Sequence, residues 1–210
     1  TALMTQQNPF VLADSVASDV NQESFSMYAG ASLKMTEQLF TALKLQFVTT
    51  SLSDQTDPRP KTNAMRFEAK PGVVWSIDGR NNLGIAGNIG MYRSDISHTI
   101  VNNLVNNVYF LMKGMGDNMQ FTSSDVLSYP RDYKGTSIAG SAQWNTLSRG
   151  FSNLIELIFS ANNETATDGG AAYTFKGGDY SARQIALYDR FSFKTSDTFW
   201  HQLMMRAAYI

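Results

Sequence analysis

Cysteine is absent from the 210 residues, which excludes disulfide bonds and thiolate metal sites. Histidine occurs only at His98 and His201, and neither has a carboxylate or a second histidine nearby at metal-ligand spacing. Charged residues make up 17% of the chain, below the roughly 25% of soluble domains. The net charge of −1 offers no argument for nucleic-acid binding.

Long apolar runs are also missing. Hydrophobic residues make up 43% of the chain, yet no window approaches the roughly 20 apolar residues of a membrane helix. Asn, Ser, Thr, Gln and Gly interleave with the apolar residues instead, which is typical of strands with one wet and one apolar face. No basic region followed by an apolar leader opens the chain, so we expect a mature, processed or excised segment.

Apolar and polar residues alternate with a period of two along much of the chain, and this alternation predicts β-strands. Around Phe67, for example, Met65 and Ala69 share one face while Arg66 and Glu68 take the other. Pro71 follows in the same strand, where a proline normally indicates an edge or a bulge. About eight strands are visible, over residues 26–34, 39–47, 65–77, 83–91, 138–145, 155–160, 181–194 and 203–209.

The two faces of these strands predict two environments. Side chains on the apolar faces are expected to contact lipid, and they include Leu45, Phe67, Ile85 and Leu157. Side chains on the polar faces are expected to line a wet lumen, and they include Lys44, Arg66, Glu68, Asn88 and Glu156. So polar an inner face is more typical of a larger barrel than of a closed eight-stranded one, whose interior is filled by side chains.

The connections between the strands alternate in length. Short ones fall at residues 34–38, 78–82, 148–152 and 195–198, and long ones at 51–62, 97–135 and 162–179. This alternation predicts the connectivity of an outer-membrane barrel, with tight periplasmic turns and long external loops. A soluble all-β sandwich or lipocalin remains the alternative, although such folds have no reason for regularly alternating loop lengths.

One segment departs from the strand pattern. Apolar residues recur at steps of three and four from Ile100 to Met112, a stripe that includes Leu104, Val108 and Leu111. Two glycines follow shortly afterwards, and glycine commonly terminates helices. We therefore predict a short amphipathic helix inside the longest loop, with another strand as the alternative.

The first long loop contains Asp57, Pro58, Arg59 and Pro60. Each proline fixes the backbone φ angle and extends the residue before it, so this stretch predicts a stiff loop entry. A contact of Arg59 with a ligand or partner is the alternative interpretation.

No GxSxG, HExxH or phosphate-binding loop pattern occurs. Residues 84–90 look loosely like a dinucleotide loop but lack the GxGxxG spacing. We accordingly expect no catalytic residues, no cofactor and no metal.

With its Asp57–Pro60 stretch, the chain resembles an uncharacterised family of Bacteroidota outer-membrane β-barrel proteins. Leu39–Val48 and Pro71-Gly72, on either side of that stretch, are similar to the family's flanking strands. Leu111–Gly116 and Trp144–Asn153 are further similar pieces. Members of that family are about twice as long, so the resemblance implies a partial barrel, and it implies no catalytic residues.

These observations predict an all-β fold, an antiparallel transmembrane β-barrel or partial barrel with short periplasmic turns, long external loops and one loop helix. Residues 1–24 are expected to form a connection or loop, and residues 25–210 the barrel segment. We also expect the first and last strands not to pair with each other, because the strands barely reach the smallest closed number.

The expected function is that of a bacterial outer-membrane protein. It is either a channel or transport component, or a structural partner in an outer-membrane complex. The expected partners are the lipid bilayer and, through the long loops, other outer-membrane proteins, with no nucleic acid. The alternative is a soluble all-β ligand-binding protein.

Overall fold

The chain folds into two antiparallel β-sheets in the computed structural model, which describes residues 9–16, 19–57, 59–102, 104, 107–122, 130–169, 174–196 and 198–210. All the regular secondary structure in these ranges is β-strand. Accordingly, no helix of the described residues is long and apolar enough to cross a membrane.

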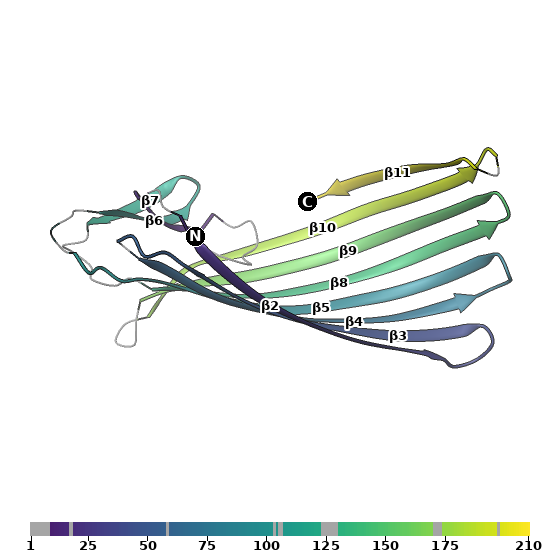
Figure 1. Cartoon of the computed structure of the whole chain (residues 1–210), viewed down its shortest axis with the longest axis horizontal. Coiled ribbons are helices and arrows are strands. Elements are labelled where there is room, and N and C mark those ends of the chain that lie inside the picture. The colour runs from purple at the N-terminus through teal and green to yellow at the C-terminus, as the bar shows by residue number, and fades with distance from the viewer. Residues whose placement is uncertain are drawn as a thin grey trace.

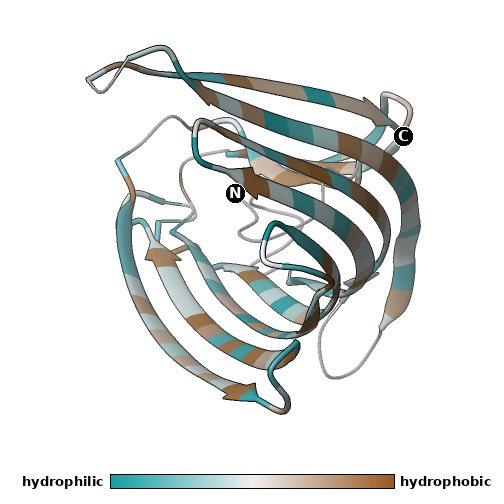
Figure 2. Cartoon of the chain, turned by 90° about the vertical axis from the view of Figure 1, so that its right-hand side faces the viewer, coloured by the Kyte–Doolittle hydropathy of each residue, from teal (hydrophilic) through white to brown (hydrophobic). Residues whose placement is uncertain are grey.

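The larger sheet contains eight long strands. Strands that are neighbours in sequence are hydrogen-bonded neighbours in space, except that β5 pairs with β8. The order across the sheet is β11-β10-β9-β8-β5-β4-β3-β2, and it curves like a trough (Figures 1 and 2). The strands are β2 (Asn21–Lys34), β3 (Leu39–Ser53), β4 (Pro60–Ser76), β5 (Asn81–His98), β8 (Arg131–Ser148), β9 (Phe151–Asp168), β10 (Phe175–Lys194) and β11 (Trp200–Tyr209).

The smaller sheet lies inside the curve of the larger one, at the end of the long connections (Figure 1). It consists of β1 (Leu12–Asp14), β6 (Val108–Gly114) and β7 (Asp117–Thr122), in the order β1-β6-β7. We call this three-stranded sheet the plug. It brings the start of the chain against a hairpin inserted between β5 and β8.

The four predicted short connections are confirmed, but two of the three predicted long ones are shorter than expected. Residues 54–59 join β3 to β4 and residues 169–174 join β9 to β10, because the strands on either side are longer than predicted. Short turns join β2 to β3, β4 to β5, β8 to β9 and β10 to β11 at one end, and the longer connections gather at the other (Figure 1). The turn after β4 shows how a side chain stabilises one of these short turns. The carboxylate of Asp78 accepts hydrogen bonds from the backbone N–H groups of Arg80 (2.8 Å) and Asn81 (2.6 Å). This local bonding is the usual way in which Asp favours a tight turn.

The larger sheet is open. Strands β2 and β11 form its two edges and are not hydrogen-bonded to each other, so the described residues contain no closed barrel. The prediction that the first and last strands of the sheet do not pair is therefore confirmed. Pro71 lies in the middle of β4, and the β4–β5 ladder skips Lys70 and Pro71 without changing register.

The predicted loop helix is wrong. Leu104 lies in a turn, and Val108, Leu111 and Met112 belong to strand β6, while residues 103, 105 and 106 lie outside the described ranges. Asparagines in this stretch favour turns over helix, and the β-branched and aromatic residues that follow favour strand. In so short a segment, apolar residues that are spaced for a helix can also be spaced for a strand. Pairing with β1 and β7 then favours the strand.

The glycines that we interpreted as a helix end instead form a hairpin turn between β6 and β7. Gly114, Met115 and Gly116 have φ angles of 103°, 53° and 86°. Glycine adopts this left-handed region without steric cost, which is why the hairpin forms there. At the start of the chain, the segment 1–24, which we expected to be a connection, contains β1, and β2 begins at Asn21.

Candidate functional site: the polar concave face and its plug

The two faces of the larger sheet differ in chemistry. Alternate residues of a strand point to opposite faces, and the face that carries Ile96 and Tyr133 packs against the plug, so it is the concave one. The convex face carries many exposed large apolar side chains, among them Met27, Leu33, Leu43, Val73, Trp75, Ile89, Met91, Ile138, Trp144, Ile155, Phe159, Ile185, Leu187, Leu203 and Met205. We call this surface the apolar band.

The four residues predicted to face lipid all lie on the convex face. Phe67, Ile85 and Leu157 are 39%, 63% and 53% exposed, and Leu45 is half-buried. Ile85 and Leu157 share one row across the sheet, because both pair with Ala142 of β8. The structure thus brings the apolar set onto one surface, and contact of that surface with lipid stays a prediction.

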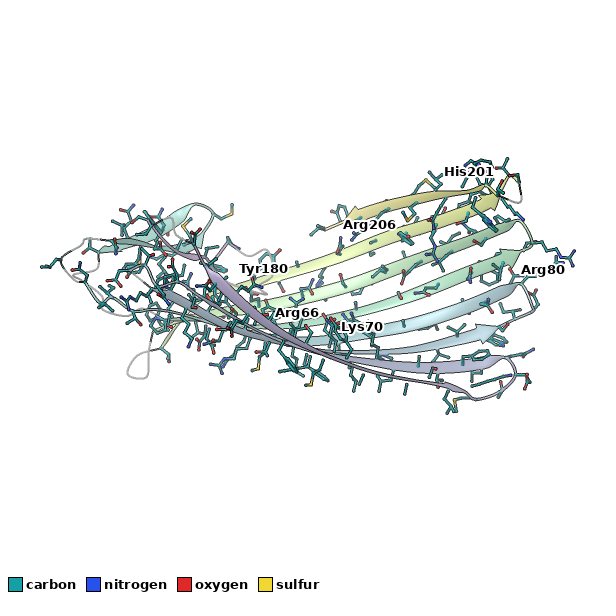
Figure 3. All side chains as sticks on the ribbon, in the orientation of Figure 1. Arg66, Lys70, Arg80, Tyr180, His201 and Arg206 are labelled. Atoms are coloured by element: carbon teal, nitrogen blue, oxygen red, sulfur yellow. The ribbon has the colours of Figure 1, made fainter. Side chains whose placement is uncertain are left out.

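The five residues predicted to line the lumen all lie on the concave face. The ammonium group of Lys70 lies 2.8 Å from Glu68, and the amide of Gln143 donates to Glu156 at 2.8 Å. Two cations lie over aromatic rings, Arg66 over Tyr92 at 5.7 Å and Lys44 over Tyr28 at 5.6 Å. Figure 3 places Arg66 and Lys70 on the middle stretch of β4. Most charges of this wall are therefore paired with neighbouring polar or aromatic groups.

A polar pocket of about 250 Å³ opens on this wall. Its concave-face lining comes from four adjacent strands and consists of Arg66, Glu68, Asn88, Gly90, Tyr92, Ser137, Ala139, Ser160 and Asn162. The side-chain oxygen of Asn88 is buried and makes no hydrogen bond. A buried acceptor without a donor is costly, so this oxygen is suited to a donor from water or from a polar solute.

Two glycines give the aromatic and hydroxyl side chains of the wall their room. A Cβ atom on Gly135 would lie 2.0 Å from the ring of Tyr92, and one on Gly90 would lie 2.3 Å from the hydroxyl of Ser137. Tyr92 therefore lies flat across β8 only because position 135 has no side chain.

The plug is held first by an apolar core. Leu12 and Leu111 of the plug pack with Ile96, Tyr133 and Ala166 of the concave face, and all five are buried. The hydroxyl of Tyr133 also donates to the backbone carbonyl of Phe10 at 2.6 Å. The plug therefore covers the concave face at the end of the long connections.

A buried ion pair joins the plug to the sheet. The guanidinium of Arg131 makes two hydrogen bonds to Asp168, the one from Nη2 at 2.7 Å, and a third to the carbonyl of Met112 in the plug at 3.1 Å. Arg131 is 0% and Asp168 1% exposed. The pair lies against Gly177, where a Cβ atom would meet both side chains, and β10 bulges at that position.

His98 lies under the plug, 1% exposed. Its Nε2 is 3.7 Å from Asp14, and its ring meets that of Tyr109 edge-on at 5.1 Å. Burial raises the pKa of Asp14, but the neighbouring His98 and the hydrogen bond from the backbone N–H of Val16 outweigh it and hold the pKa below its ordinary value. Burial, together with the charges of Asp14 and Asp57, raises the pKa of Tyr109 to about 12.

In the Asp57–Pro60 stretch, Asp57 joins the loop before β4 to the connection that follows β5. Asp57 accepts hydrogen bonds from the backbone N–H groups of Val101 (3.1 Å) and Asn102 (2.6 Å), and Arg59 donates to it at 2.9 Å. The bond from Asn102, the largest cause, lowers the pKa of Asp57. Pro60 begins β4, and Pro58 lies outside the described residues. These contacts agree with a stiff loop entry. However, Arg59, which we expected to be extended because it precedes Pro60, has a φ angle of 47° in the left-handed region.

The residues that dock the plug were missed by sequence reasoning. Arg131 and Asp168 are 37 positions apart and carry no local motif. The only available signal was that Asp168 ends a strand and Arg131 begins the neighbouring one, which suggests pairing only once the strand order is known. His201, the other histidine, stacks on Phe193 at 5.0 Å. Among the described residues, no three His, Asp or Glu side chains gather as metal ligands do.

Comparison with known proteins relates the whole chain to one family. The model of a family described as "Family of unknown function (DUF6850)" matches residues 1–210. The chain belongs to this family. A search of curated proteins finds no match to this DUF6850 chain. The family assignment covers the sheet, the polar pocket and the plug together, and it brings no reaction or ligand with it.

Proposed function

We propose that this DUF6850 chain forms the wall of a transmembrane β-barrel in a bacterial outer membrane. The observation that carries the proposal is the opposite chemistry of the two faces of one sheet. The apolar band extends over nine residues of β4, Phe67–Trp75, and nine of β5, Leu83–Met91. A transmembrane strand needs about 9–11 tilted residues. Soluble proteins rarely expose so continuous an apolar surface.

The sheet edges fit the same proposal. In the larger sheet, β3, β4, β5, β8 and β9 are paired on both sides. Strands β2 and β11 each have one unpaired edge, and so do residues 175–184 of β10, which lie beyond the end of β11. In hydrocarbon each unpaired backbone group costs several kcal/mol, because no water is present to replace the missing partner. We propose that further strands pair with both edges and complete the ring.

The lumen of such a barrel would be lined by the concave face. Its paired charges and its pocket around Asn88 suit small polar solutes, so the first candidate activity is that of a channel or transport component. The long connections, on the plug side, are then the external loops.

The plug favours a second candidate, a structural partner in an outer-membrane complex. Its buried Arg131–Asp168 pair and apolar core close off part of the concave face, and a closed lumen would leave the loops as the working surface. In either case the partners would be the bilayer and, through the loops, other outer-membrane proteins.

Vesicle flotation tests the membrane proposal. The chain is refolded with phospholipid vesicles, washed with alkaline carbonate and spun through a density gradient. We expect the protein to float with the lipid after the wash. Protein that stays soluble and monomeric without detergent would instead identify an all-β ligand-binding protein.

Planar-bilayer recording on the assembled ring, in which further strands pair with both edges of the sheet, separates the two candidate activities. A transport component would give steps of ionic current that increase when β6 and β7 of the plug are removed by deleting residues 107–122. A structural wall would insert without conductance in both forms.

A further inference from the structure

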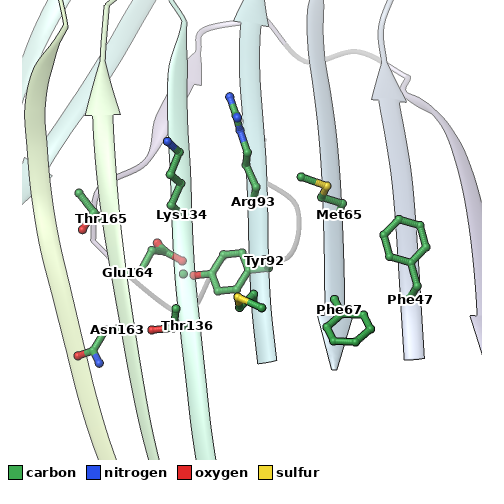
Figure 4. Close-up of a pocket in the computed structure, with 12 residues that line it drawn as sticks. Phe47, Met65, Phe67, Tyr92, Arg93, Lys134, Thr136, Asn163, Glu164 and Thr165 are labelled. Atoms are coloured by element: carbon green, nitrogen blue, oxygen red, sulfur yellow. The ribbon is translucent and has the colours of Figure 1, made fainter. Parts of the chain in front are cut away.

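A groove of about 480 Å³ lies where the apolar band ends on the convex face (Figure 4). Phe47 pairs with Phe67, and Phe67 with Met91, so these three side chains form one apolar row across β3, β4 and β5. Met65, one row nearer the long connections, completes the apolar part of the groove. This surface is wide enough for a hydrocarbon chain and lies outside the lumen.

The next row toward the long connections is cationic. Arg93 pairs directly with Lys134 across β5 and β8, and both line the groove. Figure 4 shows the two side chains extending side by side from neighbouring strands. Lys134 is exposed and makes no ion pair with any described residue. Its ammonium group is therefore available to an anion located just above the apolar row.

The row beyond the cations is acidic. Asp95 pairs directly with Asp132 across the same two strands, and like charges directly opposite each other are unfavourable. Arg93 donates to both, to Asp95 at 2.7 Å and to Asp132 at 3.3 Å. Burial and the neighbouring Asp95 raise the pKa of Asp132. One guanidinium thus serves two carboxylates, and a second cation would complete the cluster.

The order of these rows defines a ligand. Successive rows on one face are about 7 Å apart along the strands, and they run apolar, then basic, then acidic. A phosphoethanolamine lipid has the complementary order of acyl chain, phosphate and ammonium. The two basic and two acidic side chains also cancel formally, which favours a zwitterionic headgroup over a purely anionic one.

We infer that this groove binds a membrane lipid with a phosphoethanolamine headgroup. Its acyl chain lies on the apolar row, its phosphate contacts Lys134 beside Arg93, and its ammonium contacts the Asp95–Asp132 pair. The inference rests on the proposed function, because an acyl chain reaches this face only if the apolar band lies in lipid.

Lipid retention measured by native mass spectrometry tests the inference. The chain in detergent is exchanged into equal amounts of phosphatidylethanolamine, phosphatidylcholine and phosphatidylglycerol, and the lipids that survive detergent removal are counted. We expect phosphatidylethanolamine to be retained most. Choline lacks the N–H donors for the carboxylates, and glycerol lacks the cation.

Two variants separate the contacts. Lys134→Gln should weaken retention of phosphatidylethanolamine several-fold, since it removes a charge-assisted bond to phosphate. Asp132→Asn should leave phosphate binding intact and abolish the preference over phosphatidylglycerol. The matched control is Lys61→Gln, an exposed lysine on the same face of β4 outside the groove, which should change nothing.

The outcomes distinguish this inference from the membrane proposal. A chain that fails to float with vesicles overturns the proposed function and this inference with it. A chain that floats, but retains all three lipids equally or is unaffected by Lys134→Gln, overturns the inference alone. Preferential retention of phosphatidylglycerol would assign a simple anion site and remove the phosphoethanolamine assignment.

Discussion

At the scale of single residues, the structure depends on which side chains are absent as much as on which are present. Gly135 lets the Tyr92 ring cross strand β8, and Gly177 makes room for the buried ion pair. On the convex face the same strand carries Gly140, where a Cβ atom would meet nothing within 4 Å. Two glycines on one strand therefore differ in whether they tolerate an added side chain, depending on the face on which they lie.

Gly135→Ala should be destabilising while Gly140→Ala should not be. The added methyl at position 135 meets a buried aromatic ring, so overpacking should cost about 1–3 kcal/mol. Chemical unfolding of both variants in lipid gives the comparison. In a Tyr92→Ala background, Gly135→Ala should cost less stability than it does when Tyr92 is present. Equal effects at both glycines would show that Tyr92 does not occupy this position.

Depth in the apolar band should control the cost of a charge. Ile85 lies beside the middle row of the band and Phe67 at its edge, so Ile85→Arg should cost about 2–4 kcal/mol and Phe67→Arg about 0–1 kcal/mol. Refolding titrations in vesicles measure both. The same cost at the two depths would count against a bilayer around this face.

At the scale of elements, the plug is a small sheet with little core of its own. It is stabilised by the concave face through Leu12 and Leu111, by Arg131, and by the His98–Asp14 contact. A two-stranded hairpin is marginal in isolation, and the third strand of the plug, β1, has only three residues. Docking of the plug therefore depends on a few named contacts.

Asp168→Asn should loosen the plug. Removing one charge leaves buried Arg131 uncompensated, which typically costs about 3–5 kcal/mol. Native-state proteolysis of residues 107–122 reports the opening. As a control, Glu37→Gln breaks the Lys34–Glu37 pair, whose side chains are 49% and 92% exposed, and should cost no more than about 1 kcal/mol. Equal proteolysis of the two variants would argue against this anchoring role.

Acid should release the plug through Asp14. Its pKa is lower when docked, so ionised Asp14 stabilises docking fully above its ordinary pKa of 3.8, and the contribution is lost as the pH falls through the lower docked value. His98 and Tyr109 are the titratable groups that face it. The chain has no cysteine, so a spin label on Val11→Cys can report mobility. The label should be freed below about pH 4, and Asp14→Asn should remove that step; a step that persists would belong to another group.

At the scale of the whole molecule, the fold is a trough with two unpaired edges (Figure 2) and a plug at one end (Figure 1). The trough has enough strands for a small closed barrel but does not close. Its concave face is too rich in Arg, Lys and Glu to form the dry interior of an eight-stranded barrel. The polar wall and the open edges therefore both support the proposal of a larger ring.

The chain by itself should lack the behaviour of a closed barrel. In SDS gels a closed barrel migrates differently before and after boiling, because the unboiled ring excludes detergent. We expect this chain to migrate identically in both states, since β2 and β11 leave the ladder open. A compact, heat-sensitive band for the monomer would show that these two strands do pair in solution.

The alternation of residue types by itself determined the presence of eight strands, their two faces and the short turns. It could do so because the face of a strand depends only on local parity. The residues predicted for the apolar and polar faces, such as Ile85 and Arg66, accordingly lie on opposite sides of the sheet. The open edges were also predictable, since the polar inner face is itself a local property. The alternation did not determine the length of the strands: the strand expected over 155–160, for example, spans Phe151–Asp168.

Only the tertiary structure decided the plug and its contacts. The stretch around Val108 is compatible locally with helix or strand, and pairing with β1 and β7 selects strand. Arg131 and Asp168, like the Asp95–Asp132 pair, are brought together by strand register across 37 residues of chain. A register is a property of two strands at once, so no pattern within either strand specifies it.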